Sequence, residues 1–251
     1  MIIIFIEGPC PKRLNIFKIS ALRTPYSNII DILSELRASG IYFPQSALST
    51  YSTIYTKLPR IASLFRSIDA DSKVYFLTPL GLLSENDPAI WYEECFADIP
   101  PDRLRKILQK FGGLDKIYDI LEERFDLAIF CLSTRLLKVV ELEYFVPTDK
   151  PCIVVSDAYS STKHNIYSIT PNHFLVSRLR KTYGKVTITD IYQYSLEYIA
   201  KSLSIIKDEL GNIKSLFRQP ETLFQKIFSQ KILNTIFAPS KKQNKLVKFI
   251  R

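Results

Sequence analysis

Residues 73–96 read KVYFLTPLGLLSENDPAIWYEECF, and this stretch decides the class of fold. Its first part, residues 74–77, is a short apolar and aromatic run that is typical of a buried strand. The turn formers Pro79, Gly81, Asn86 and Pro88 then end the run. Open α/β sheets bind ligands beyond the carboxyl ends of their strands, so the loop after the run is either a ligand-binding loop or an ordinary turn.

Other runs of strand length occur before and after this stretch, at residues 2–6, 127–132, 152–155 and 186–188. Between most of them lie segments with helical spacing of apolar residues, at 26–39, 59–68 and 114–125. Strands that alternate with amphipathic helices form right-handed crossovers and a parallel sheet. The sequence therefore predicts an α/β fold, a mainly parallel open sheet with flanking helices, over residues 1–189, with a candidate internal break at 147–151.

Long helical patterns replace this alternation near the carboxyl end, so residues 190–251 are predicted to form a helical, basic region. One helix is expected over 190–211, with Asp190 and Gly211 at its two ends. A second helix is expected over 220–237, and its apolar residues cover a broad face. That face must pack either on the sheet domain or on a partner protein.

The composition excludes several classes of protein. An apolar fraction of 47% and a mean hydropathy of +0.04 are typical of a globular chain, and no apolar run is long enough to span a bilayer. The opening MIIIFI reads as a buried strand and not as a signal peptide, which favours the cytoplasm. The four cysteines, Cys10, Cys95, Cys131 and Cys152, lack metal-ligand spacing, so reduced thiols are expected in place of a zinc site or disulfides.

The net charge of +9 is concentrated near the carboxyl end. Residues 201–251 carry eleven Lys or Arg against three Asp or Glu, whereas residues 1–200 carry 23 against 22. Clustered cations favour a polyanionic partner, because neutralised phosphates release counterions, but a solvated basic helix face has the same composition. The candidate nucleic-acid contacts are Lys241, Lys242, Lys245, Lys248 and Arg251.

The carboxyl ends of parallel strands lie along one edge of a sheet, so the residues that follow each run are expected to be neighbours. Hydroxyl groups with Lys and Arg suit an anionic or nucleotide-like ligand, and carboxylates suit an amine, a ribose hydroxyl or a nucleobase edge. Turn chemistry alone selects the same residue types. The candidate ligand-binding residues are Glu7, Lys12, Thr78, Gly81, Glu85, Ser133, Arg135, Ser156 and Asp157.

The chain contains none of several enzyme signatures. It has no GxxxxGK[ST] phosphate loop, no GxGxxG, no GxSxG elbow and no HExxH. This disfavours a P-loop NTPase or a dinucleotide enzyme, and it leaves the cofactor and the catalytic residues unspecified. The aromatic residues Tyr42, Phe43, Tyr51 and Tyr55 are base-stacking candidates if they are exposed and core residues if they are buried.

Residues 48–96 resemble the α/β module of archaeosine synthases and related tRNA-guanine transglycosylase-like proteins. That module has a Tyr-containing segment before a helix, a strand that ends in a Ser/Thr-Pro-Leu-Gly-like turn, and an acidic stretch that leads to a Tyr. The matching residues are Thr78, Pro79, Leu80, Gly81, Glu85 and Tyr92. The resemblance implies that Gly81 lets the backbone approach a ligand. SENDP replaces the usual Pro-Arg/Leu-Glu-like run of the family, so no catalytic role is carried over.

Two functions follow from these observations. The resemblance implies a tRNA-modification component that holds a deazaguanine-type base or a nucleotide at the sheet edge, while the basic C-terminal helices grip phosphate. The lack of a catalytic signature favours a non-catalytic nucleic-acid-binding or assembly protein of replication, repair or defence, whose C-terminal helices dock a partner protein. Nucleic acid is the expected partner in both, with tRNA favoured over DNA.

Overall fold

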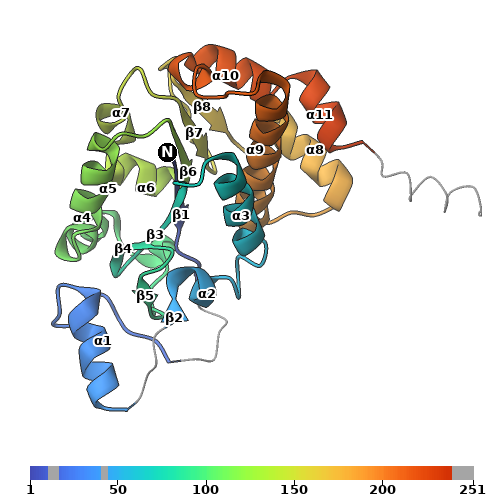
Figure 1. Cartoon of the computed structure of the whole chain (residues 1–251). Helices are drawn as coiled ribbons and strands as arrows, with labels where there is room; N and C mark the ends of the chain where they lie inside the picture. Colours follow the sequence, from blue (N-terminus) through green and yellow to red (C-terminus); the bar gives the residue numbers. More distant parts are fainter. Residues whose placement is uncertain (11–16, 41–44, 239–251) are drawn as a thin grey trace, which may run out of the picture.

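The computed structural model describes residues 1–10, 17–40 and 45–238, and the centre of this part is a six-stranded sheet (Figure 1). Its strands are β1 (Ile2–Glu7), β3 (Lys73–Thr78), β4 (Gly81–Ser84), β6 (Leu127–Cys131), β7 (Cys152–Val155) and β8 (Ile166–Ile169). They lie in the order β4-β3-β1-β6-β7-β8, with β4 antiparallel to β3 and all other pairs parallel. The predicted α/β class and the mainly parallel sheet are confirmed.

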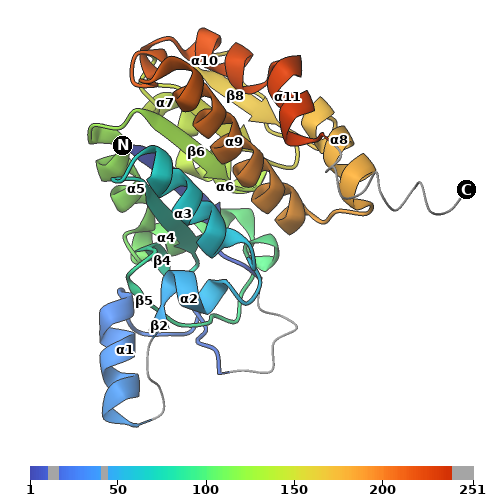
Figure 2. The ribbon, with the colours of Figure 1, turned by 45° about the vertical axis from the view of Figure 1, so that its right-hand side comes forward.

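Helices flank the sheet on both faces, as Figures 1 and 2 show. On one face α3 (Leu58–Ile68) packs against α9 (Ile188–Leu210), and on the other lie α4 (Pro101–Lys110) and α5 (Gly113–Glu122). The other helices are α1 (Ile29–Ala38), α2 (Ala47–Tyr51), α6 (Thr134–Val140), α7 (Leu142–Phe145), α8 (Phe174–Tyr183), α10 (Pro220–Ile227) and α11 (Gln230–Ile236). Two 3-10 turns, η1 (Phe96–Asp98) and η2 (Leu216–Arg218), and the short antiparallel pair β2 (Gln45–Ser46) and β5 (Pro88–Ala89) complete the fold.

The central strands are apolar throughout because both of their faces are covered. Every residue of β6 and β7 is buried, as is typical of parallel strands between two helical layers. A row of aromatic rings crosses the sheet, in which Phe5 stacks on Phe130 and on Tyr75 with ring centroids 4.6 and 5.4 Å apart. Such cross-strand pairs fix the register of β1 between its two neighbours.

The strand order creates a switch point at one edge of the sheet. From β1 the chain crosses to β3 on one side and later to β6 on the other side. The crossovers therefore diverge at β1 and β6, and a crevice opens beyond the carboxyl ends of these two strands. This edge is where an open α/β sheet is expected to bind a ligand.

The predicted strand at 186–188 is wrong, because these residues lead into α9. The Thr187 side chain accepts a hydrogen bond from Asp190 N, and the Asp190 side chain accepts one from Thr187 N. The capping residue is therefore Thr187, three residues before Asp190, and the helix begins at Ile188. The fifth parallel strand of the described structure is instead β8, a stretch that the sequence analysis did not identify.

The predicted helix over 220–237 consists of two helices. It is interrupted between α10 and α11, where the Ser229 side chain accepts a hydrogen bond from Ile232 N and starts α11. The apolar faces of both helices are buried, and Tyr198 of α9 donates a hydrogen bond to the Ile227 carbonyl at 2.7 Å. The broad apolar face thus packs on the protein's own α9. Within the described ranges, no helix is long and apolar enough to cross a membrane.

Candidate functional site

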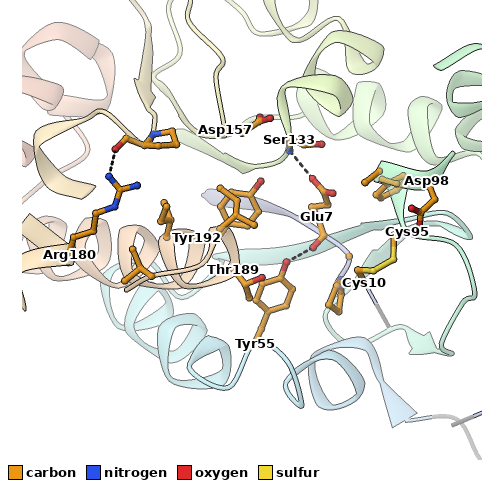
Figure 3. A pocket seen from close by; sticks show the side chains of 18 residues that line it. Glu7, Cys10, Tyr55, Cys95, Asp98, Ser133, Asp157, Arg180, Thr189 and Tyr192 are labelled. Atoms are coloured by element: carbon orange, nitrogen blue, oxygen red, sulfur yellow. Dashed lines mark hydrogen bonds between the residues drawn. A yellow bond between two sulfur atoms is a disulfide. The ribbon is translucent and has the colours of Figure 1, made fainter. Parts of the chain in front are cut away.

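A cavity of about 550 Å³ lies at the switch point of the sheet (Figure 3). Its walls come from the ends of β1, β6 and β7, from the turn around η1, and from the segment that joins α8 to α9. The polar and aromatic lining residues are Glu7, Tyr55, Phe96, Asp98, Ser133, Asp157, Arg180, Thr189 and Tyr192. Glu7, Ser133 and Asp157, three of the predicted ligand-binding residues, therefore border one cavity.

Glu7 is the last residue of β1 and reaches across to the end of β6. Its Oε2 accepts a hydrogen bond from Ser133 N at 2.7 Å (Figure 3). Burial raises the pKa of Glu7, the Ser133 hydrogen bonds oppose this shift, and the negative charge of Asp157 adds to it. Glu7 thus stays protonated to a higher pH than an ordinary glutamate.

Asp157 follows β7, and its pKa is shifted in the opposite direction from that of Glu7. Its Oδ1 accepts hydrogen bonds from Thr134 N and Thr134 Oγ1, both at 2.7 Å. Burial by itself raises the pKa of Asp157, but the hydrogen bonds from Thr134 hold it below the ordinary value. One cavity therefore contains a carboxyl group with a raised pKa and another with a lowered pKa, a pattern found in acid–base pairs.

The backbone that carries Glu7 is held by three hydrogen bonds. Tyr55 Oη donates to the Glu7 carbonyl at 2.7 Å, Gly8 N donates to the Leu77 carbonyl at 2.7 Å, and Tyr92 Oη donates to the Pro9 carbonyl at 2.8 Å. A Cβ atom on Gly8 would lie 2.4 Å from Tyr92 Oη, so only glycine fits beneath this tyrosine. These contacts fix the position of the Glu7 side chain before any ligand binds.

A cation and aromatic side chains form the wall opposite Glu7. Arg180 of α8 is exposed, and its Nη1 donates to the Pro171 carbonyl at 3.2 Å (Figure 3). Tyr192 of α9 is buried and faces the cavity from the same side as Thr189. The cavity thus has carboxyl groups on one wall and a guanidinium group at the other, so it presents acceptors and a cation to one ligand.

The expectation of four reduced cysteines is wrong for two of them. Cys10 and Cys95 form a disulfide that lines the cavity, and 85 residues separate them in the sequence. Spacing rules detect only cysteines close together in the chain, so this pair left no local signal. Cys131 and Cys152 are free and buried, and burial raises the pKa of both thiols.

Thr78, Gly81 and Glu85 do not line this cavity, which corrects the sequence-based site. Thr78 Oγ1 donates to the Gly81 carbonyl at 2.9 Å, so the TPLG turn closes the hairpin between β3 and β4. Because β4 runs antiparallel, Glu85 lies at the opposite edge of the sheet, where its backbone N–H donates to the Val74 carbonyl and its carboxylate pairs with Arg66. The turn that resembles the transglycosylase-like module thus forms a β-hairpin and does not line this cavity.

The other predicted residues support the cavity or fall outside the described structure. Ser156 is buried, and its Oγ accepts a hydrogen bond from Tyr159 N at 2.8 Å. Arg135 donates to the Ala97 and Ile99 carbonyls and so holds the η1 turn against the site. Lys12 and the tail cations Lys241, Lys242, Lys245, Lys248 and Arg251 lie outside the described residues.

Of the two alternatives for Tyr51 and Tyr55, base stacking or a place in the core, the structure supports the core. Both rings are buried, with Tyr51 donating a hydrogen bond to the Ile90 carbonyl and Tyr55 to the Glu7 carbonyl. Tyr42 and Phe43, named with them, are not among the described residues. Arg180 and Tyr192 were not predicted as site residues, because only the return of the C-terminal half over the sheet edge brings them to the cavity.

Within the described ranges, no group of three or more His, Cys, Asp or Glu side chains is placed to hold a metal ion. The polar side chains that line the cavity are the carboxyl groups of Glu7, Asp98 and Asp157, several hydroxyl groups and the guanidinium group of Arg180. Comparison with protein-family models, with curated proteins and with solved structures finds no match for this chain.

Proposed function

We propose that the cavity binds a nucleobase or a nucleotide, and that the protein is a component of nucleic-acid modification, of tRNA in the first place. The observation that carries this proposal is the placement of Glu7 and Asp157 at the switch point, opposite Arg180. Nucleotides bind at this position of open α/β sheets. A ligand with hydrogen-bond donors on one side and a phosphate on the other matches the two walls.

The carboxyl group of Glu7 selects the kind of base. A carboxylate offers about four lone-pair sites, and the contacts with Ser133 leave some of them for a ligand. An ionised carboxylate accepts from two neighbouring N–H groups, such as the ring imide and the exocyclic amine of a guanine-type base. A neutral carboxyl group pairs instead with an adjacent donor and acceptor. Only guanine-type bases, including deazaguanines, present the two adjacent N–H donors that suit the ionised form. Cytosine, uracil and adenine also present the donor–acceptor pair that suits the neutral form, so selectivity for guanine-type bases rests on the ionised carboxylate.

The first test is binding of guanosine, 7-deazaguanosine, adenosine and cytidine by isothermal titration calorimetry. Replacement of Glu7 by Gln keeps the size of the side chain but removes its negative charge and half of its acceptors. We expect Glu7→Gln to weaken guanosine binding by about 10- to 100-fold, since a hydrogen bond to a charged group contributes roughly 1.5–3 kcal/mol. Glu122→Gln, at an exposed position of α5, is the matched control and should bind as the wild type does.

Equal binding by wild type and Glu7→Gln, or binding of none of the nucleosides, would contradict the base-binding cavity. The modification profile of tRNA from cells that lack the protein then separates the two functions. Loss of a modified base supports the modification component. An unchanged profile, together with retained nucleoside binding, supports the non-catalytic nucleic-acid-binding protein. A cytoplasmic location belongs to this proposal.

A further inference from the structure

The mouth of the cavity adjoins a part of the chain that is rich in cations. Residues 158–189 contain five Lys or Arg and no Asp or Glu, although the first 200 residues as a whole are nearly balanced in charge. Four of these cations, Arg178, Arg180, Lys181 and Lys185, lie on α8 or just after it and are exposed. Within the described residues, none of the four forms an ion pair with a carboxylate.

The cations occupy the solvent face of α8. Leu175, Val176 and Leu179 bury the inner face of this helix. With 100° between successive residues, Arg178, Arg180 and Lys181 therefore spread over the outer half of the helix. Arg180 reaches the cavity, and Lys185 precedes Val186 and Ile188, which line the same cavity. The positive surface is thus continuous with the base-binding site.

A stacked pair of tyrosines lies beside these cations. Tyr183, at the end of α8, stacks on Tyr194 with ring centroids 4.2 Å apart and an angle of 9° between the rings. The Tyr183 side chain is 49% exposed, and Lys57 Nζ lies 3.7 Å from the centroid of the Tyr194 ring. Half-exposed rings among cations are the features with which proteins hold single-stranded nucleic acid, because bases stack on the rings while phosphates contact the cations.

We infer that the outer face of α8, formed by Arg178, Arg180, Lys181 and Lys185 with Tyr183 at its end, binds the backbone of a polynucleotide and delivers one unpaired base to the cavity. This inference rests on the proposed function of the cavity. It also names the substrate class: a nucleotide within a single-stranded or looped chain and not a free nucleotide. A base must leave its stack to enter such a cavity, so continuous duplex is excluded as the preferred ligand.

The test is fluorescence anisotropy of labelled single-stranded RNA and DNA of about twelve nucleotides, a length that covers a site of this size. The full chain is used throughout, so residues 239–251 contribute equally to every variant. We expect the triple variant Arg178→Gln, Lys181→Gln, Lys185→Gln, which leaves Arg180 in the cavity, to bind about 100-fold more weakly near 0.1 M salt. The slope of log affinity against log salt should fall by about 2, since each lost contact removes about 0.7 for single strands.

The matched control removes three exposed cations from the opposite side of the sheet, with Arg103→Gln, Lys106→Gln and Arg124→Gln. We expect its salt slope to stay that of the wild type. Thermal unfolding of both variants verifies that each is folded. Equal slopes for the α8 variant and the control overturn the inference, as does equal or tighter binding of a duplex of the same length. Equal displacement of the RNA by polyglutamate overturns it in favour of an acidic protein partner.

The experiments distinguish an error about the α8 surface from an error about the cavity. If guanosine binds in the cavity and depends on Glu7, but the α8 variant binds RNA normally, the surface is wrong and the cavity stands. If the α8 variant loses RNA while no nucleoside binds and Glu7→Gln changes nothing, the cavity is wrong. The RNA and DNA probes then show which backbone the surface prefers, because only RNA offers a 2′-hydroxyl group.

Discussion

At the scale of single residues, the chemistry of the cavity depends on the contacts and burial of Glu7, and not only on the fact that this residue is a glutamate. Its backbone is fixed by Tyr55 Oη, and its carboxyl group by Ser133 N. The same residue at a strand end exposed to water would keep the ordinary pKa, but here burial raises it. A raised pKa also affects folding, because the native state then binds a proton more tightly than the unfolded chain.

This coupling predicts how stability depends on pH. The stabilisation linked to the Glu7 proton is fully present below the ordinary pKa of 4.5 and is lost as the pH rises through the higher pKa of the folded state. Glu7→Gln is neutral at every pH and does not lose it. The free energy of unfolding of this variant, relative to wild type, should therefore increase with pH. Urea unfolding of both proteins between about pH 4 and 8 measures the difference, and a constant or falling difference would show that Glu7 is not buried as described.

At the scale of elements, the stretch 73–96 contributes Cys95 and Phe96 to the cavity wall, whereas its TPLG turn does not line the cavity. The run at 74–77 became β3, and the turn after it closes a hairpin with β4. Gly81 has φ +105°, and a Cβ atom there would lie 2.7 Å from the Phe111 carbonyl oxygen. The close approach that the sequence suggested for Gly81 is therefore made with Phe111 at the end of α4, not with a ligand.

Gly81→Ala should accordingly destabilise the fold and leave the cavity intact. We expect a loss of about 1–3 kcal/mol in the free energy of unfolding from the positive φ alone, and a further loss from the contact with Phe111. Guanosine affinity per folded molecule should not change. Gly112→Ala is the matched control, since Gly112 also has a positive φ but has no atom within 4 Å of its added Cβ. Equal losses in the two variants would mean that the contact with Phe111 contributes nothing.

The parallel sheet was predictable because its buried strands are continuous apolar runs that differ from their flanks, such as residues 2–6 and 127–132. β8 was missed because it is short and its two central residues, Tyr167 and Ser168, are only half-buried. The apolar residues at 186 and 188 suggested a strand, but Thr187 between them caps α9. Local hydropathy therefore predicts strands that are fully buried. It does not predict a half-buried strand such as β8, or a helix start that depends on a capping side chain.

At the scale of the whole molecule, the cavity is assembled from distant parts of the chain. The loop after β1 and the η1 turn meet through the Cys10–Cys95 disulfide, and α9 brings Tyr192 to the other side. Residues after parallel strands, such as Ser133 and Asp157, were predictable from topology. Arg180, Tyr192 and the disulfide were not, because their positions depend on how the C-terminal half and the η1 turn close over the edge.

The disulfide closes a long loop and so restricts the unfolded chain. Its removal should therefore lower the free energy of unfolding. A cross-link between residues separated by 85 positions lowers the conformational entropy of the unfolded chain, which is worth roughly 4.5 kcal/mol in the chain-entropy model. The free energy of unfolding of the double variant Cys10→Ser, Cys95→Ser should therefore be about 4.5 kcal/mol lower than that of the oxidised wild type. A thiol reductant should lower the wild type to nearly the same value and leave the variant unchanged.

Cys152→Ala provides the matched control, because it removes a buried thiol that is not cross-linked. The Cys152→Ala variant loses packing in the core, so its free energy of unfolding should be lower than that of the wild type. Reductant should lower this free energy by the same amount in the variant as in the wild type. A wild type that is indifferent to reductant, with the same stability as the double serine variant, would show that the two cysteines are not joined in solution. If they are joined, the double variant should also bind guanosine more weakly, because Cys10 and Cys95 hold two segments of the cavity wall together.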